Sequence, residues 1–310
     1  MEIKQLKYFL SVTELGSFSK AAISLSVAQP VLSRQIRSLE DELGIELLYR
    51  NGRGIAVTEA GQILVGHART IVDTERAVGM EIDAMRADPS GKMVIGMPPT
   101  ASAVLTVPLV QRFREVYPKV KLKVDVGYSG HVLEWLSTGR IDVAVLYNAP
   151  KTSTLTTEPL LEEELLLIGP KNTPAHLCRS PLPASAIAGV PMILPSHPHG
   201  LRVLIERLLG SIGVQPNVVF EIDNLNACLE LVEKGFGYTI LPFASVAEKV
   251  RAGELIASAL VEPRMTRQLV LATSTQRPTT NVTRALAKTV TRLVRDLIQD
   301  GVWVPRADIP

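Results

Sequence analysis

The first 58 residues show short amphipathic stretches separated by turn signals. Apolar residues recur every three to four positions from Leu6, which predicts a helix that ends at Gly16. Ser17 provides an N-cap for a second helix. A third helix begins at Gln29-Pro30, because proline suits the first turn of a helix, and it ends at Gly44. The chain therefore opens with three consecutive predicted helices.

A turn-rich hairpin follows the third predicted helix. Asn51-Gly52 lies within an otherwise extended segment between Leu48 and Thr58, and an Asn-Gly pair in such a setting is a hairpin signal. Three helices followed by a hairpin predict a winged helix-turn-helix domain over residues 1–58.

The next stretch, residues 59–87, contains no proline and predicts one long helix. Apolar residues and one glutamate recur along it at alternating spacings of four and three residues. These positions are Leu64, Ala68, Ile71, Glu75, Val78, Ile82 and Met85. Such a heptad seam predicts pairing with a second copy of the chain or packing against a neighbouring domain. A surface helix packed on its own chain is the alternative.

A third region runs from about residue 92 to residue 300, after the helix-breaking segment Asp88-Pro89-Ser90-Gly91. Short apolar runs alternate there with helical patterns. The predicted strands are 93–96, 120–126, 141–146, 165–168, 192–194, 218–222, 238–241 and 268–273. The predicted helices are 102–116, 130–137, 201–209, 226–234 and 280–298. This alternation predicts α/β units with mostly parallel sheets.

The third region divides into two predicted lobes. The apolar strand from Glu164 to Pro170 begins a second cycle of α/β units, and the strand after Arg267 returns to the first. We therefore expect lobe I at about 92–162 and 268–300, and lobe II at about 163–267. The architecture is that of a two-lobed ligand trap such as a periplasmic binding protein. A ligand would bind in the cleft, at the carboxyl ends of the strands.

Composition narrows the class of protein. The 310 residues are 46% hydrophobic and 21% charged, with a formal net charge of +2, and no apolar run is long enough to cross a bilayer. The N-terminus lacks the pattern of a secretory signal, which predicts a cytoplasmic protein without a membrane partner. Cys178 and Cys228 are far apart and outside metal-ligand spacing. We expect reduced packing thiols, no metal and no cofactor, with a regulatory thiol as the alternative.

Four motifs in order identify a family resemblance. They are residues 16–22 (GSFSKAA), 29–36 (QPVLSRQI), 39–44 (LEDELG) and 47–50 (LLYR), and TEAG at 58–61 then opens the long helix. Together they resemble the LysR-type transcriptional regulators, and the rest of the chain looks like the effector domain of that family. Residues 95–97, residues 142–147 and the wing are most similar to nitrogen-assimilation regulators.

The resemblance implies a sequence-specific regulator of transcription that binds double-stranded DNA. It implies a homodimer formed through the linker helix at 59–87, or a homotetramer, with activity set by a small-molecule effector. RNA polymerase is a candidate partner. One departure is Ala28, which stands where the family usually carries serine or threonine before Gln29-Pro30, so a hydroxyl cap or phosphate contact is missing.

The DNA-contacting residues are predicted from the distribution of charge. Residues 1–58 carry seven basic and six acidic side chains, but on the third helix the basic and amide side chains precede the acidic ones. The N-terminal end of a recognition helix enters the major groove, where Gln29 can pair with adenine and Arg34 with guanine or a phosphate. The predicted DNA-binding residues are Gln29, Pro30, Ser33, Arg34, Arg37 and, in the wing, Arg50 and Arg53.

Two turns in the third region carry hydroxyl side chains at predicted helix starts, where backbone amides attract anions. Thr100 and Ser102 follow one strand, and Ser129 follows the next. In the family these turns border the inducer pocket, so the resemblance assigns effector binding to these three residues. Weaker candidates across the cleft are Ser196, His199, Arg202, Asn224 and Asn226. We expect a small carboxylate as the effector. Helix capping and a solvated loop are the alternative roles.

An enzyme and a solute-binding protein are the competing classes. Gly127-Tyr128-Ser129-Gly130 lacks the spacing of a nucleophile elbow, and Gly235-Phe236-Gly237 lacks the third glycine of a dinucleotide fingerprint. The sequence therefore predicts no catalytic residue. Residues 92–300 alone would suit a solute trap, but the winged domain and the absent export signal favour a regulator.

Overall fold

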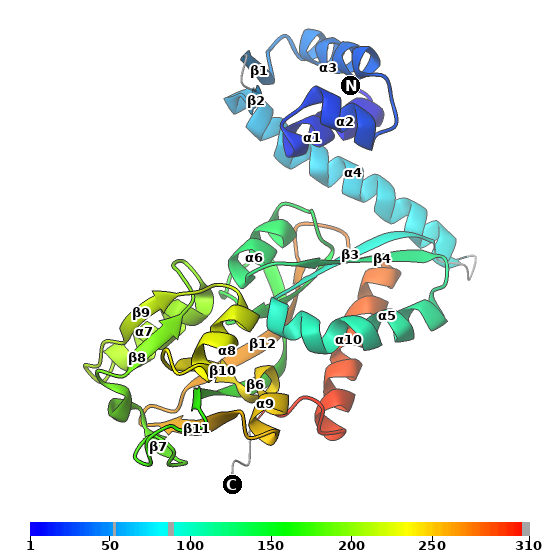
Figure 1. The fold of residues 1–310 in the computed structure, drawn as a ribbon. Coiled ribbons are helices and arrows are strands. Elements are labelled where there is room, and N and C mark those ends of the chain that lie inside the picture. Colours follow the sequence, from blue (N-terminus) through cyan, green and yellow to red (C-terminus); the bar gives the residue numbers. More distant parts are fainter. Residues whose placement is uncertain (52–53, 86–89, 306–310) are drawn as a thin grey trace.

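The computed structural model describes residues 1–51, 54–85 and 90–305, with a small helical domain at one end of a long helix and an α/β domain at the other (Figure 1). The helical domain contains α1 (Ile3–Leu15), α2 (Phe18–Ser24) and α3 (Gln29–Leu43). Strands β1 (Leu48–Asn51) and β2 (Gly54–Val57) then pair antiparallel. The predicted three helices and hairpin are confirmed.

Local signals account for the helix ends. Gly16 and Gly44 end α1 and α3 with positive φ angles of 59° and 70°, a conformation that glycine adopts without strain. The Oγ of Ser17 accepts a hydrogen bond from the backbone N–H of Lys20 at the start of α2. Ala28 occupies the N-cap of α3 without a side-chain bond, and Pro30 lies in its first turn.

The linker helix α4 (Glu59–Met85) carries the predicted seam, and its two halves have different surroundings. Its N-terminal half packs on its own helical domain, since Leu64, Ala68 and Ile71 join the core formed around Phe9. Glu75 is paired within the chain, with its carboxylate 2.9 Å from the ammonium of Lys7. The first half of the seam therefore packs against the neighbouring helical domain of the same chain, which is one of the two arrangements that the seam predicts.

Other apolar side chains of α4 remain exposed. Ile63, Val78 and Ile82 keep 62%, 51% and 46% of their surface accessible. Val78 and Ile82 belong to the predicted seam, whereas Ile63 does not. Exposed apolar residues on one helix mark a surface that another protein surface can cover.

Lobe I is built on a mixed sheet with helices on both faces. Its strands are β3 (Gly91–Met97), β4 (Val120–Val126), β5 (Val143–Tyr147), β12 (Thr266–Ser274) and the first half of β6 (Leu155–Pro170), in the order β4-β3-β5-β12-β6. Its helices are α5 (Pro99–Val116), α6 (Ser129–Ser137) and α10 (Asn281–Gln299). Apolar residues of α5 and α10 pack with one set of strand side chains, and those of α6 pack with another.

Lobe II continues from the second half of β6. Its strands are β7 (Leu182–Pro183), β8 (Pro191–Leu194), β9 (Asn217–Glu221), β10 (Thr239–Pro242) and β11 (Leu255–Val261). Its helices are α7 (Gly200–Gly210), α8 (Leu225–Glu233) and α9 (Ala247–Arg251), with 3₁₀ turns η1 (Ala184–Ile187) and η2 (Phe243–Ser245). A separate apolar core fills this lobe.

The expectation of mostly parallel sheets is wrong. Strand β3 pairs parallel with β4 and β5, as do β8 with β9 and β7 with β11. Strand β12 pairs antiparallel with both β5 and β6, and β6 pairs antiparallel with β10 and β11. The reason is that the chain passes between the lobes twice. Strand β6 leaves lobe I and β12 returns to it, so the two crossing strands run in opposite directions side by side.

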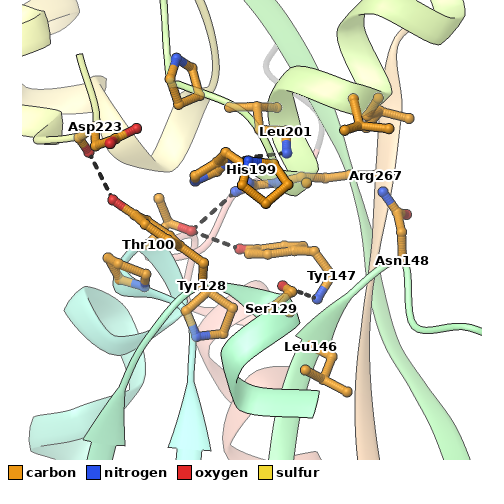
Figure 2. A pocket seen from close by; sticks show the side chains of 18 of the residues that line it. Thr100, Tyr128, Ser129, Leu146, Tyr147, Asn148, His199, Leu201, Asp223 and Arg267 are labelled. Carbon is orange, nitrogen blue, oxygen red and sulfur yellow. Dashed lines mark hydrogen bonds between the residues drawn. The ribbon is translucent and has the colours of Figure 1, made fainter. Parts of the chain in front are cut away.

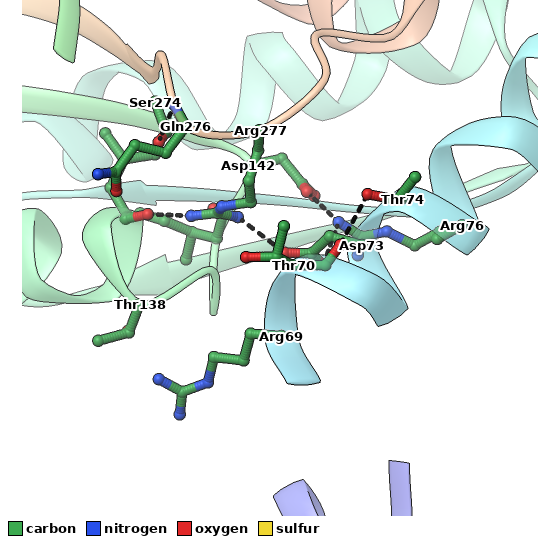
Figure 3. A network of polar contacts seen from close by, with 12 residues as sticks. Arg69, Thr70, Asp73, Thr74, Arg76, Thr138, Asp142, Ser274, Gln276 and Arg277 are labelled. Carbon is green, nitrogen blue, oxygen red and sulfur yellow. Dashed lines mark hydrogen bonds and ion pairs between the residues drawn. The ribbon is translucent and has the colours of Figure 1, made fainter. Parts of the chain in front are cut away.

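A charged network joins the linker helix to lobe I (Figure 3). On α4, Asp73 accepts a hydrogen bond from Nη1 of Arg277 at 3.2 Å, and Arg76 pairs with Asp142. Arg277 also donates to the backbone carbonyls of Leu136 and Ile141. The side chains of Asp73, Asp142 and Arg277 are 14%, 9% and 12% exposed, so the linker helix is held by largely buried charges. We call these four charged residues the linker network.

The linker network depends on a close approach at Gly139. This residue has a φ of 79°, and a Cβ added to it would lie 2.8 Å from Oδ2 of Asp73. We expect Gly139→Ala to destabilise the fold by about 1–2 kcal/mol from the left-handed conformation alone, and also to displace Asp73. Urea unfolding followed by circular dichroism measures the loss. Gly210→Ala is the control: its Cβ meets open space and its φ is not positive, so equal destabilisation by both would contradict the explanation.

Candidate functional site

The N-terminal half of α3 presents the predicted DNA-contacting side chains to solvent. Gln29, Pro30, Arg34 and Arg37 are exposed, and Ser33 is half-buried. Neither arginine forms an ion pair with any described residue. The Oε1 of Gln29 accepts a hydrogen bond from Ser19 at 3.2 Å, which orients the amide. The side chain of Arg50, and Arg53 as a whole, lie outside the described residues.

The acidic end of α3 has a structural role. Oε1 of Glu40 accepts hydrogen bonds from the backbone N–H groups of Leu47 and Leu48, at 2.9 and 3.2 Å. Glu40 therefore holds the start of the wing against the recognition helix. Glu42 pairs with the N-terminal ammonium of Met1. These contacts separate an acidic, internally bonded end from a basic, unpaired end of the same helix.

A cavity of about 440 Å³ lies between the two lobes of the α/β domain (Figure 2). Lobe I contributes Thr100, Ser129 and Tyr147, among others, and lobe II contributes His199 and Leu204. Its volume falls within the range of small-molecule sites. Prolines and aliphatic side chains from both lobes form much of its wall.

Three of the eight predicted effector residues line this cavity, namely Thr100, Ser129 and His199. The other five lie outside its lining. Ser102 bonds Thr106, Ser196 bonds Asp223, Arg202 pairs with Glu206 and Glu221, and Asn224 caps α8. Asn226 is exposed on α8. Local contacts explain four of these side chains, but only Asn224 has the capping role that was the alternative. Arg202 is buried on α7, so the alternative of a solvated loop is wrong for it.

The starts of three helices face the cavity. Thr100 follows the first residue of α5, Ser129 begins α6 and Gly200 begins α7, and all three line the wall. Free backbone amides and the helix dipoles make such ends favourable for an anion. The Oγ of Ser129 accepts a bond from the backbone N–H of Tyr147 at 3.1 Å, so the hydroxyl proton remains available to a ligand.

Arg267 forms the polar floor of the cavity, and Glu163 pairs with it from behind the lining. Arg267, 5% exposed, and Glu163, 1% exposed, stand opposite each other on the crossing strands β12 and β6. Nε and Nη2 of Arg267 lie 2.6 and 2.5 Å from Oε2 of Glu163. The indole N–H of Trp303 donates to Oε1 of the same carboxylate at 2.9 Å. The two strands that cross between the lobes, β6 and β12, therefore hold a charged pair next to the cavity.

Aromatic and hydroxyl groups complete this floor. The Arg267 guanidinium carbon lies 3.6 Å from the ring centroid of Tyr147, and its Nη2 donates to Thr100 at 3.3 Å. Thr100 in turn donates to the Tyr147 hydroxyl at 3.2 Å. Burial raises the pKa of Tyr147 well above its usual range, so the phenol stays neutral.

His199 and Tyr128 close one side of the cavity across the lobes. Their rings meet edge to face with centroids 4.4 Å apart, and the Tyr128 hydroxyl donates to the backbone carbonyl of Asp223 at 3.4 Å. Burial lowers the pKa of His199, despite the nearby carboxylate of Asp223. Nδ1 of His199 accepts the backbone N–H of Leu201 at 3.0 Å, so the neutral ring carries its proton on Nε2.

The sequence reasoning missed Arg267, Glu163, Tyr147 and Tyr128. Tyr147 ends a strand that the family resemblance had already marked, which was a usable signal. Glu163 and Arg267 look like ordinary surface charges in the sequence, because only the register of β6 against β12 places them together.

Cys178 is exposed and Cys228 is buried, and both are free thiols. Across the described residues no helix has the length and apolar character needed to cross a membrane, and no group of side chains is arranged to hold a metal ion.

Comparison with known proteins identifies the family. A model of the bacterial regulatory helix-turn-helix proteins of the lysR family matches residues 3–62, and a model of the LysR substrate binding domain matches residues 86–295. The nitrogen assimilation regulatory protein nac of Klebsiella aerogenes is 29% identical over 272 residues, covering 87% of this chain and 88% of that protein. The transcriptional regulator BbuR of Bordetella bronchiseptica is 32% identical over 300 residues, covering 96% and 91%.

Solved structures show the same fold over most of the chain. A full-length OxyR variant from Pseudomonas aeruginosa superposes with a TM-score of 0.76 at 20% identity, covering 95% of each chain. Full-length CbnR in complex with its target DNA gives a TM-score of 0.64 at 24% identity, covering 94% of this chain and all of that one. The chain therefore belongs to the LysR family, as a DNA-binding transcriptional regulator with an effector-binding domain rather than an enzyme.

Proposed function

We propose that this regulator reads its operator with the exposed end of α3 and with the wing. The supporting observation is that Gln29, Arg34 and Arg37 are exposed, and that the two arginines are unpaired within the described residues. Pro30 and Ser33 lie on the same helix end, and Arg50 and Arg53 belong to the wing by sequence. Base-edge contacts would come from α3, and phosphate or minor-groove contacts from the wing.

The regulator is proposed to act as a homodimer through α4, with a tetramer as the larger assembly. The exposed Ile63, Val78 and Ile82 support this proposal, because a second copy can cover them. The proposed units are residues 1–58, 59–87 and 92–300. A cytoplasmic location follows from its action on DNA, and contact with RNA polymerase stays a prediction. Sedimentation equilibrium of the full chain separates monomer, dimer and tetramer.

The effector is proposed to bind in the cavity between the lobes. The cavity itself carries this proposal, since its wall comes from both lobes and a ligand there contacts both. Thr100, Ser129 and His199 remain effector-contacting residues, whereas Ser102, Ser196, Arg202, Asn224 and Asn226 are not retained. A small carboxylate suits the three helix starts that face the cavity.

Ligand binding would change transcription by shifting the arrangement of the lobes. A ligand that contacts both lobes favours one relative position of the lobes. The linker network connects lobe I to α4, so a movement of lobe I would also move α4. In a dimer or tetramer this changes the spacing or bend of the bound half-sites. Selection of genomic fragments by the purified chain, with and without a small-molecule extract of cells, tests the whole proposal. Sequence-independent binding that the extract leaves unchanged would contradict it.

Filling the cavity should separate DNA binding from effector response. Gly130 lines the cavity, and a side chain added there meets no atom within 4 Å at its Cβ. We expect Gly130→Phe to keep operator affinity within about twofold, because α3 is unchanged, and to abolish the response to the extract. Gly210→Phe is the matched control at a helical glycine away from the cavity. Loss of the response in both variants would mean that cavity filling is not the cause.

A further inference from the structure

Arg267 has a donor that no described residue uses. Its Nε and Nη2 are bonded to Glu163 and Thr100, whereas its Nη1 makes no hydrogen bond. Every fully buried side-chain nitrogen or oxygen of the described residues has a hydrogen-bond partner. Nη1 must therefore reach accessible space, although the residue as a whole is only 5% exposed. The space that Arg267 borders is the cavity, as Figure 2 shows.

The surroundings of Nη1 determine what it can bind. Tyr147 packs on the guanidinium face and Glu163 holds its edge, so the group has one position and loses little entropy on binding. Arg267 as a whole is only 5% exposed, and a charged donor in such a place binds an ionised oxygen more strongly than a neutral one. Helix starts of α5, α6 and α7 add positive potential from other directions.

The same contacts limit the charge of the ligand. Glu163 already compensates the charge of Arg267. A ligand carboxylate at Nη1 therefore gives the three groups together a net charge of −1. Helix starts can offset one such charge, but a second carboxylate finds only Arg207, which is exposed and screened by solvent. The wall away from the floor is formed by Pro98, Pro195, Leu204 and similar side chains, which favour an apolar body.

We infer that Arg267 is a specificity-determining residue of the effector site and selects a monocarboxylate with an apolar body through Nη1, while Glu163 and Trp303 act as its positioning residues. This inference rests on the proposed function, because it assigns the ligand class of the same cavity. It also gives Glu163 a testable role, since its charge weakens the attraction of Arg267 for the ligand.

Phenylacetate and phenylacetamide are suitable probes, because they share a ring and a shape and differ in charge. Succinate serves as an aliphatic dicarboxylate. Calorimetric titration of the full chain should show phenylacetate binding about tenfold more tightly than phenylacetamide, as one charge-assisted bond predicts. Phenylacetate should also bind more tightly than succinate. In a Trp135→Phe background, the emission of Trp303 reports occupancy through Glu163 and Arg267.

Two variants distinguish charge recognition from structural support. Arg267→Gln with Glu163→Gln removes both charges together, and it should weaken phenylacetate by about tenfold without changing phenylacetamide. Glu163→Gln alone leaves Arg267 uncompensated, and it should tighten phenylacetate severalfold. A merely structural role of the pair predicts the opposite sign for Glu163→Gln. The double variant leaves no buried charge without its partner, so it tests Arg267 even if Glu163→Gln alone does not fold.

The outcomes separate this inference from the proposed function. If cell extract alters operator binding of the wild type, but phenylacetate binds no better than its amide or than succinate, the inference on Arg267 is overturned and the proposed function stands. Weaker phenylacetate binding by Glu163→Gln would also overturn it. If the extract has no effect on operator binding, the effector proposal itself fails.

Discussion

Arg34→Ala should weaken binding to the selected operator by about 5- to 150-fold, the range for loss of one bidentate base contact of roughly 1–3 kcal/mol. Binding to random DNA should fall much less. Arg34 is exposed and unpaired within the described residues, so its removal leaves the core of the helical domain intact. Fluorescence anisotropy with the operator and with a scrambled duplex, at one fixed salt concentration, measures both affinities.

The salt dependence of DNA binding by Arg34→Ala distinguishes a phosphate contact of Arg34 from a base contact. A phosphate contact contributes equally on every sequence and reduces the slope of log affinity against log salt by about 1. A base contact changes the affinity ratio between operator and scrambled duplex instead. Equal losses on both duplexes would assign Arg34 to a phosphate. Arg295→Ala, which removes an exposed arginine from α10, controls for the general loss of positive charge.

The winged domain could be predicted almost completely because its signals are local. Glycines with positive φ end α1 and α3, Ser17 caps α2, and Pro30 lies in the first turn of α3. Each of these residues acts on backbone within four positions of itself, so neighbouring sequence contains the whole argument. For α4 the apolar spacing predicted packing but left its partner open, and the first half of the helix packs on the helical domain.

The effector domain was harder to predict because its site is assembled from distant segments. The first half of β6 was missed, since residues 155–164 carry four glutamates and two threonines and show no continuous apolar run. Strand β11 was missed as well. Thr100 and Ser129 could be predicted because each lies in a turn from a strand to a helix, which is a local signal. Arg267 and Glu163 face each other only because of the register between β12 and β6. No spacing in the sequence contains that information.

Arg277→Met should destabilise the junction between α4 and lobe I by about 3 kcal/mol, the lower end of the cost of breaking a buried ion pair. The substitution leaves Asp73 and Asp142 with Arg76 as their remaining cation in the linker network. It also removes the donor to the carbonyls of Leu136 and Ile141. Hydrogen exchange of the amides in residues 73–77 and 136–141 measures the junction directly. Arg292→Met, at an exposed position of α10, is the matched control.

Substitution of Asp73, the partner of Arg277, should destabilise the junction far less than Arg277→Met does. Burial raises the pKa of Asp73 above its ordinary value, although Arg277 and Arg76 both lower it. The folded chain therefore holds a proton on Asp73 more firmly than the unfolded chain does, and the contribution of Asp73 to stability declines as pH rises through the carboxyl range. Asp73→Asn imitates the protonated form. We expect it to cost less than about 1 kcal/mol at neutral pH, with a flatter pH dependence of exchange.

Combining the two substitutions tests whether charge compensation is the reason. Asp73→Asn should recover about 1–2 kcal/mol of the Arg277→Met loss, because it removes the carboxylate that would otherwise stay buried without its partner. If the two free-energy losses simply add, the loss in Arg277→Met comes entirely from the hydrogen bonds between Arg277 and the backbone carbonyls. In either case Arg277→Met loosens α4 from lobe I, so operator affinity should persist while the response to cell extract declines. A full response in that variant would show that the linker network does not carry the signal from the cavity to DNA.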